Sequence, residues 1–177
     1  MSHRFESASS GRSKCRGCGQ SIHRGELRFG ERLENPFADG KEMTIWFHPT
    51  CAACKRPEPF LQALGKTPEN VLDRTRLERA AHDGLKHPRL PRIDGVERSP
   101  SGQATCRSCR NAIERGSWRI RLAFFEEGRF SPGGFVHLAC RGAYFDTEDV
   151  LDRVLQFSPG LSDDEREDLR RACEAGR

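Results

Sequence analysis

Residues 15–18 read Cys-Arg-Gly-Cys, and residues 48–51 read His-Pro-Thr-Cys. A C-x2-C turn places two thiolates along one edge of a tetrahedron, and a distant H-x2-C segment supplies the other two ligands of a structural zinc site. With all four positions taken by protein side chains, no open position is left for a water nucleophile, so the predicted zinc is structural rather than catalytic. The 29 residues between the pairs leave room for a hairpin.

The same ligand pattern occurs twice. A shift of 91 positions superposes six identities of the string C-x2-C-x3-I-x-R-G-x2-R, and a shift of 89 superposes the two H-x2-C pairs. Matches of this number at fixed spacing indicate a tandem repeat. We therefore predict two zinc ions per chain, one held by Cys15, Cys18, His48 and Cys51, the other by Cys106, Cys109, His137 and Cys140.

One alternative ligand set exists in the first repeat. Cys51 and Cys54 form a further C-x2-C, so an all-cysteine site without His48 is conceivable. The repeat favours His48, because the position that corresponds to Cys54 in the second copy is Ala143, which cannot bind metal. Cys54 and Cys173 are then expected to be buried small hydrophobes or free thiols.

The composition agrees with metal-stabilised modules. The 177 residues are 35% hydrophobic and 32% charged, with a mean hydropathy of −0.74, which is too polar for one well-filled core. No apolar run is long enough for a membrane span, and the first residues lack the apolar segment of a secretory signal. Metal ligation is therefore the expected use of the eight cysteines, in an intracellular compartment. Arg outnumbers Lys 25 to 5, which favours a bacterial cytoplasm or nucleoid, with the nucleus expected if the source is eukaryotic.

The predicted fold class is α+β, with two small zinc modules that each combine a short antiparallel hairpin with C-terminal helices. Strands are expected at 27–29 and 44–47, and again at 118–122 and 135–136. One helix is expected from an N-cap at Thr67 to about Ala81, and another from a Ser162/Glu165 capping box to about Glu174. Residues 83–100 hold five Gly and Pro residues and are expected to be a semi-flexible linker between modules 8–82 and 101–175.

Charge is unevenly distributed along the chain. Residues 1–89 carry 16 basic and 11 acidic residues, whereas the stretch after Arg141 carries 5 basic and 10 acidic ones. A basic first half suits a polyanionic partner, although an excess this small is also typical of a solvated surface.

The ligand spacing and its neighbours resemble the poly(ADP-ribose) polymerase-type zinc finger, which occurs in tandem in DNA-damage-sensing polymerases and singly in a nick-sensing DNA ligase. The resemblance rests in the first repeat on residues 10–15, 27–28, 37–41 and 46–48, and in the second on 101–102, 118–119 and 157–162. It implies a tandem finger protein without a catalytic domain. It further implies binding to DNA nicks, gaps and ends by structure rather than sequence, with repair proteins as further candidate partners.

The resemblance also implies which residues contact DNA. Arginines near the first cysteine and on the first strand would grip phosphates, and apolar loop residues would stack on exposed bases. By position these are Arg12, Arg28, Phe37 and Met43 in the first repeat and Arg119, Phe125 and Phe130 in the second. Gln103 replaces the basic residue that corresponds to Arg12, so the first repeat is expected to be the stronger DNA contact.

Three other functions compete with DNA-break binding. A zinc-scaffolded protein adaptor, with the acidic stretch after Arg141 as its contact surface, is the main alternative. A zinc hydrolase or thiol oxidoreductase is disfavoured because all four ligands come from protein, so no enzyme activity and no small-molecule substrate are expected. A reader of intact duplex sequence is disfavoured because no helix has the Arg, Asn and Gln pattern of a recognition helix.

Overall fold

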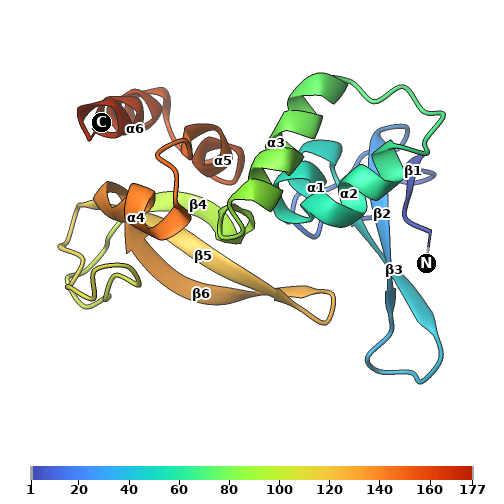
Figure 1. Ribbon diagram of the computed structural model, residues 1–177, viewed down its shortest axis with the longest axis horizontal. Helices are drawn as coiled ribbons and strands as arrows, with labels where there is room; N and C mark the ends of the chain where they lie inside the picture. The colour runs from blue at the N-terminus through green and yellow to red at the C-terminus, as the bar shows by residue number, and fades with distance from the viewer. Residues whose placement is uncertain (1, 177) are drawn as a thin grey trace. The chain divides into compact units, whose positions relative to one another are not determined.

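The computed structural model describes residues 2–176 and contains, in that range, two three-stranded sheets and six α-helices (Figure 1). Contacts divide the chain into two compact units. The first reaches to Lys86 and includes residues 125–130; the second holds residues 87–124 and the chain after residue 130. The predicted class, α+β with two small modules, is confirmed.

The first unit is built on an antiparallel sheet of β1 (Arg4–Ser7), β2 (Leu27–Glu34) and β3 (Glu42–Phe47). The register places Phe5, Phe29 and Phe47 opposite one another on three adjacent strands. Neighbouring rings in this row lie 5.5 and 6.2 Å apart, and all three side chains are buried. Such cross-strand aromatic pairs stabilise a sheet and here form one side of the core.

Two helices cover that row of rings, and a third packs on these two. α1 (Pro49–Lys55) begins directly after β3, and α2 (Pro57–Leu64) follows it; both start with proline at the first helical position, where the missing N–H has no cost. Phe60 of α2 packs edge-on against Phe29 at 5.9 Å. α3 (Arg74–Lys86) buries Leu77, Ala81 and Gly84, which share one helical face.

The predicted helix start at Thr67 is wrong. The hydroxyl of Thr67 accepts a hydrogen bond from the backbone N–H of Glu69 at 3.2 Å, which closes a local turn and not a helix. The chain becomes helical only at Arg74, after Asp73 adopts a left-handed φ of 56°. Thr-Pro is compatible with either conformation, so the sequence pattern alone did not separate them.

The second unit repeats the arrangement with β4 (Ile93–Arg98), β5 (Trp118–Glu126) and β6 (Arg129–His137). A 3-10 turn, η2 (Leu138–Cys140), then leads into α4 (Arg141–Phe145), α5 (Leu151–Gln156) and α6 (Asp163–Ala175). The predicted capping box of α6 is confirmed: the Ser162 hydroxyl accepts from Glu165 N at 3.2 Å, and Glu165 Oε2 accepts from Ser162 N at 2.8 Å.

Residues 83–100, which the sequence predicts to be a semi-flexible linker, include helical and strand residues. They contain the end of α3, a 3-10 turn η1 (Leu90–Arg92) and the whole of β4. Two of the residues that suggested a linker fit these elements: Pro91 is the second residue of η1, and Gly95 lies in a register shift of β4 with φ 111°. At the shift of 91, β4 corresponds to β1, so the structural repeat begins one strand before the first ligand pair.

Arg141 links the second ligand segment to the C-terminal helix. Its side chain is 1% exposed and donates hydrogen bonds to the carbonyls of Leu138 (3.1 Å) and Cys173 (2.8 Å). It also forms an ion pair with Glu148 at 2.8 Å. A cation at the last carbonyls of α6 is favourable for the helix dipole as well.

We predict that Arg141→Met destabilises the metal-loaded protein by about 3 kcal/mol, because it removes charged hydrogen bonds to two buried carbonyls and the ion pair with Glu148. Urea unfolding followed by circular dichroism measures the change, and Arg170→Met on the exposed side of α6 is the control. Equal midpoints for the two variants would contradict the prediction.

Candidate metal centres and basic groove

The first ligand set comes from three separate elements. Cys15 and Cys18 lie in the turn before β2, His48 directly follows β3, and Cys51 lies in α1. Their ligand atoms all lie within 4.8 Å of one another. His48 turns Nδ1 toward the Cys18 sulfur at 3.4 Å, and its backbone N–H donates to the Cys15 sulfur at 3.3 Å. The hairpin between the pairs therefore brings two distant segments to one point.

The second ligand set repeats this geometry. Cys106, Cys109, His137 and Cys140 also lie within 4.8 Å of one another. His137 Nδ1 lies 3.4 Å from the Cys109 sulfur, while Nε2 lies 3.2 Å from the carbonyl of Ala112. Donation from Nε2 to that carbonyl leaves Nδ1 unprotonated and available to a metal, which is the usual outer-shell arrangement of a histidine ligand.

The thiols of each set strongly affect one another. Hydrogen bonds from Cys18 and Cys51 lower the pKa of Cys15 to about 3, whereas hydrogen bonds with Cys15 and Cys18 raise the pKa of Cys51. In the second set, burial would raise the pKa of Cys106, but backbone N–H donors lower it to about 7. Burial and the neighbouring thiols raise the pKa of Cys140 to about 12. Several thiolates at this separation require a compensating cation. Three sulfurs and one imidazole are the donor set that zinc prefers, so each cluster fits one zinc ion.

The structure brings together the eight predicted ligands and leaves Cys54 outside both clusters. Cys54 is buried at 5% exposure within α1, as expected for a small hydrophobe.

Arg28, a predicted phosphate contact, is buried in the first unit. It is 7% exposed and lies directly across from Glu6 in the β1–β2 register, where its Nη2 donates to the Glu6 carboxylate at 2.6 Å. Its guanidinium stacks over the Trp46 ring at 3.6 Å, and Nη1 donates to the Ser13 hydroxyl at 2.9 Å. Gly30 makes room for this stack, because a Cβ there would lie 2.6 Å from the Trp46 ring.

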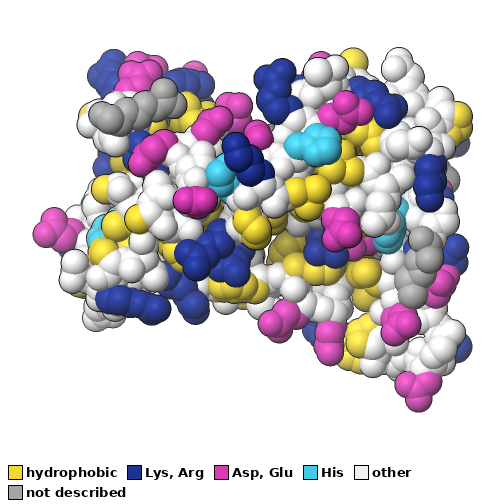
Figure 2. Space-filling model, viewed as in Figure 1, with side chains coloured by type: hydrophobic (Ala, Val, Ile, Leu, Met, Phe, Trp, Pro, Cys, Tyr) yellow, Lys and Arg dark blue, Asp and Glu magenta, His cyan; other side chains and the backbone are white. Residues whose placement is uncertain are grey.

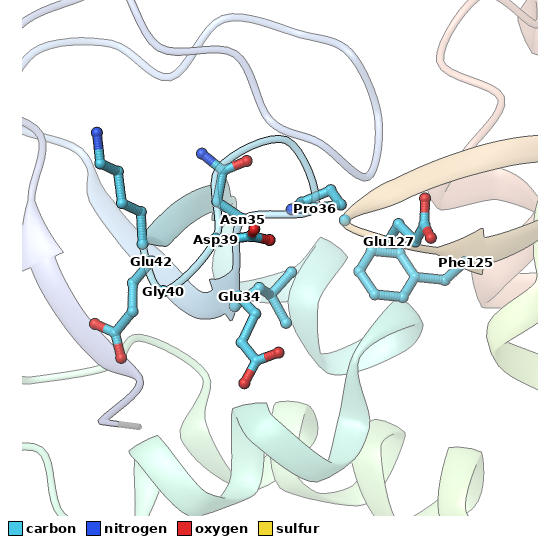
Figure 3. Close-up of a pocket in the computed structure, with 11 residues that line it drawn as sticks. Glu34, Asn35, Pro36, Asp39, Gly40, Glu42, Phe125 and Glu127 are labelled. Carbon is cyan, nitrogen blue, oxygen red and sulfur yellow. The ribbon is translucent and has the colours of Figure 1, made fainter.

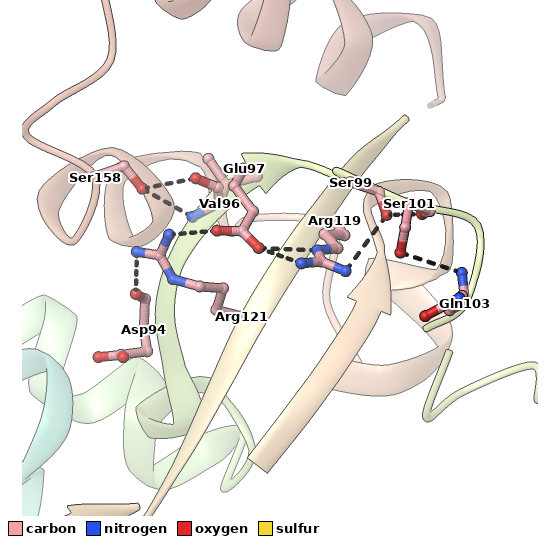
Figure 4. A network of polar contacts seen from close by, with 9 residues as sticks. All are labelled: Asp94, Val96, Glu97, Ser99, Ser101, Gln103, Arg119, Arg121 and Ser158. Atoms are coloured by element: carbon pink, nitrogen blue, oxygen red, sulfur yellow. Dashed lines mark hydrogen bonds and ion pairs between the residues drawn. The ribbon is translucent and has the colours of Figure 1, made fainter. Parts of the chain in front are cut away.

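Arg119 repeats this environment in the second unit (Figure 4). It is 6% exposed and donates from Nε and Nη2 to Glu97 at 2.9 and 2.5 Å. Arg121 binds the other carboxylate oxygen of Glu97 at 3.1 Å, and Arg119 lies 3.6 Å over the Phe135 ring. Glu97 stands 91 positions after Glu6, so the carboxylate partner belongs to the repeat; extending the comparison to β1 would have revealed it.

Both carboxylates are held in the ionised form. Partial burial would raise the pKa of Glu6 and of Glu97, but the arginines that bind them outweigh burial, and both pKa values are lowered. A lowered carboxylate pKa contributes stability that is present at neutral pH and is lost as the pH falls through that lowered value.

A basic groove lies beside the first metal centre. It has a volume of about 510 Å³ and is lined by residues before and after Cys15 and by β3: Arg12, Ser13, Lys14, Cys15, Arg16, Gly19, Thr44, Ile45 and Trp46. The side chains of Arg12, Lys14 and Arg16 are exposed, and within residues 2–176 none of them forms an ion pair. Sequence analysis missed Lys14 and Arg16, although their alternation with Arg12 around Cys15 was a readable signal. On the face shown in Figure 2, by contrast, basic and acidic side chains are intermingled.

A second hollow of about 660 Å³ lies at the β2–β3 loop and is acidic (Figure 3). Its charged lining is Glu34, Asp39, Glu42 and Glu127 against the single cation Lys41. This hollow disfavours phosphate, whereas the basic groove favours it.

The predicted stacking residues differ in accessibility. Phe37, at the tip of the β2–β3 loop, is 75% exposed and lies 5.2 Å from the Arg129 guanidinium. Phe125 and Phe130 belong to the first compact unit and are half-buried, with ring centroids 4.9 Å apart. Met43 is likewise half-buried, against Gly128. Phe37 alone of these four is exposed over most of its surface.

We predict that the purified protein contains two zinc ions per chain and that His48→Ala contains one, because the first site loses a ligand that no neighbour replaces. Cys54→Ser should keep two. Metal analysis of the three proteins tests this, and a loss of zinc from Cys54→Ser would favour the all-cysteine alternative. Chelation should unfold the chain, since structural zinc contributes about 10–16 kcal/mol at neutral pH.

No helix among the described residues is long and apolar enough to cross a membrane.

Known proteins share sequence similarity with the residues that form these metal centres. Residues 6–85 match the family described as the poly(ADP-ribose) polymerase and DNA-ligase Zn-finger region. The chain is 28% identical to a poly(ADP-ribose) polymerase of Sarcophaga peregrina over 200 aligned residues, which cover 96% of this chain and 19% of that protein. It is also 28% identical to the Drosophila melanogaster enzyme, covering 76% and 15%, and to poly(ADP-ribose) polymerase 1 of Gallus gallus, covering 67% and 13%. The chain thus spans about a fifth or less of these relatives.

The matched residues hold the first Cys3His centre, and the internal repeat reproduces that centre in the second unit. The first unit is therefore similar to a poly(ADP-ribose) polymerase-type zinc finger, and each of the two Cys3His clusters fits one zinc ion.

Proposed function

We propose that the chain is a DNA-binding module that recognises nicks, gaps and ends by structure rather than by sequence. The observation that carries the proposal is the basic groove, in which Arg12, Lys14 and Arg16 have no carboxylate partner among the described residues. Unpaired cations in one groove suit a phosphate backbone, which binds through charge and counterion release. The family description, which names poly(ADP-ribose) polymerase and DNA ligase, supports a nucleic-acid partner.

Phe37 supplies a reason for a preference for breaks. A large aromatic side chain that is 75% exposed gains free energy when a base covers it, and this stacking is tolerant of sequence. In closed duplex DNA each base face is covered by its neighbours, whereas a nick or end can expose one. Phosphate contact at the groove and stacking at Phe37 together favour a broken duplex.

The arginines have different roles under this proposal. Arg12 remains a phosphate contact, joined by Lys14 and Arg16. Arg28 and Arg119 are committed to carboxylates and rings, so we assign them to holding the sheet, with any DNA effect indirect. In the second repeat Gln103 and Thr105 stand where the first has Arg12 and Lys14, which supports the first finger as the stronger contact.

We infer that the chain contributes binding rather than chemistry, since each zinc has four protein ligands. The polymerase activity named for the relatives is not carried over, because the chain spans a fifth or less of them. Zinc-bound thiolates suit an intracellular compartment. The relatives come from two flies and a bird, so they give no support to the bacterial preference drawn from the Arg-rich composition.

We predict that a nicked circular duplex competes for the protein at least tenfold better than the same closed circle at fixed salt, because only the nick offers a base face to Phe37. Phe37→Ala should reduce this ratio. Equal competition by both circles would refute break recognition, and no DNA binding by the zinc-loaded protein would favour the protein-adaptor alternative.

The salt dependence separates direct from indirect contacts. Arg12→Gln should lower the slope of log affinity against log salt by about 0.9, the value of one phosphate contact. Arg28→Gln should weaken binding without changing that slope. Arg24→Gln, an exposed cation outside the groove lining, serves as the control. A lower slope for Arg28→Gln would instead make Arg28 a phosphate contact.

A further inference from the structure

The basic groove has more positive charge than one backbone phosphate balances. Its described lining holds three cations and no Asp or Glu. Cys15 also lines it, and three thiolates with one Zn²⁺ carry a net charge of −1, which leaves the groove and its metal centre near +2. A phosphodiester carries one negative charge, whereas a phosphomonoester carries about −1.5 to −2 at pH 7.

The uncharged lining supplies hydrogen-bond donors of the kind that a phosphomonoester needs. The Ser13 oxygen already accepts from Arg28 Nη1 at 2.9 Å, so its own proton remains available to a ligand. Thr44 brings a second hydroxyl from β3. A monoester presents three unesterified oxygens to these two hydroxyls and three cations, whereas a diester presents two.

Buried Arg28 keeps this lining in place. Its Nη1 fixes the Ser13 hydroxyl, and its guanidinium stacks at 3.6 Å on Trp46, which forms another part of the groove lining. Glu6 holds Arg28 from the other side at 2.6 Å. Arg28 is thus a positioning residue that acts through two groove residues.

We propose that this groove binds the terminal phosphate of a broken DNA strand, a phosphomonoester, in preference to an internal phosphodiester. The inference rests on the proposed function and names the chemical group that the first finger selects. The second finger is an internal reference, because Gln103, Thr105 and Arg107 leave only one cation at the corresponding positions.

The test uses dumbbell duplexes closed by loops at both ends, which carry one nick or none. Three nicked forms differ only at the break: a 5′-phosphate with a 3′-hydroxyl, a 5′-hydroxyl with a 3′-phosphate, and hydroxyls on both sides. Fluorescence anisotropy at fixed salt and pH 7.5 gives the affinity of the zinc-loaded full chain for each. We expect one phosphate-bearing nick to bind about tenfold more tightly than the hydroxyl-only nick, the effect of one additional charged hydrogen bond.

Substitutions in the groove test which residues produce the preference for a terminal phosphate. A Lys14→Gln, Arg16→Gln double variant should lose the phosphate preference to within twofold, while Arg107→Gln, the matched position in the second finger, should keep it. Zinc content verifies that each variant is folded.

Equal binding of the three nicks, or a preference that persists in the double variant, would overturn the inference. If all nicks bind equally but better than the intact dumbbell, break recognition stands and only the terminal-phosphate assignment fails; if the intact dumbbell binds as well, both fail.

Discussion

The joining of two distant segments at a metal ion is the constraint on which each unit depends. Cys15 and Cys18 precede the hairpin, and His48 and Cys51 follow it, so one ion closes the sheet at its end. The cores are thin, with a row of phenylalanines in the first unit under the two short helices α1 and α2. Because the ligands Cys15, Cys51 and Cys106 are buried in these cores, the metal and the apolar packing stabilise the same segments.

A second constraint, a glutamate–arginine ion pair stacked on an aromatic ring, also occurs in both units. In each unit a glutamate on the first strand faces an arginine on the second strand. That arginine stacks on the aromatic residue two positions before the histidine ligand, which is Trp46 before His48 and Phe135 before His137. The stack thus connects the first strand to the metal-binding segment across the sheet. The structure gives these arginines carboxylate and ring partners within the sheet, and their contact with DNA stays a prediction.

The features that are local in sequence could be predicted, and those that depend on tertiary partners could not. The eight ligands, the α6 capping box and the hairpins follow from spacing and periodicity. Arg28 looked like a solvated strand cation because its partner Glu6 lies 22 residues away on a strand that was not recognised. The same omission made β4 look like linker, since a short edge strand next to Gly and Pro has little periodicity of its own. The role proposed for Lys14 and Arg16 depends on the basic groove, which becomes visible only in the folded structure.

The unequal burial of the ligands gives the two ions different lifetimes in the protein. In the first centre Cys15 and Cys51 are 1% and 0% exposed and Cys18 is half-buried, whereas in the second Cys106 is buried, Cys140 is half-buried and Cys109 is exposed. A chelator or an electrophile in solution reaches an exposed thiolate without any opening of the fold, but must wait for a local opening at a buried one. Zinc should therefore leave the chain in sequence, the second centre first. For part of that process the molecule would hold one zinc ion, in the first unit, and the basic groove of that unit would still be intact.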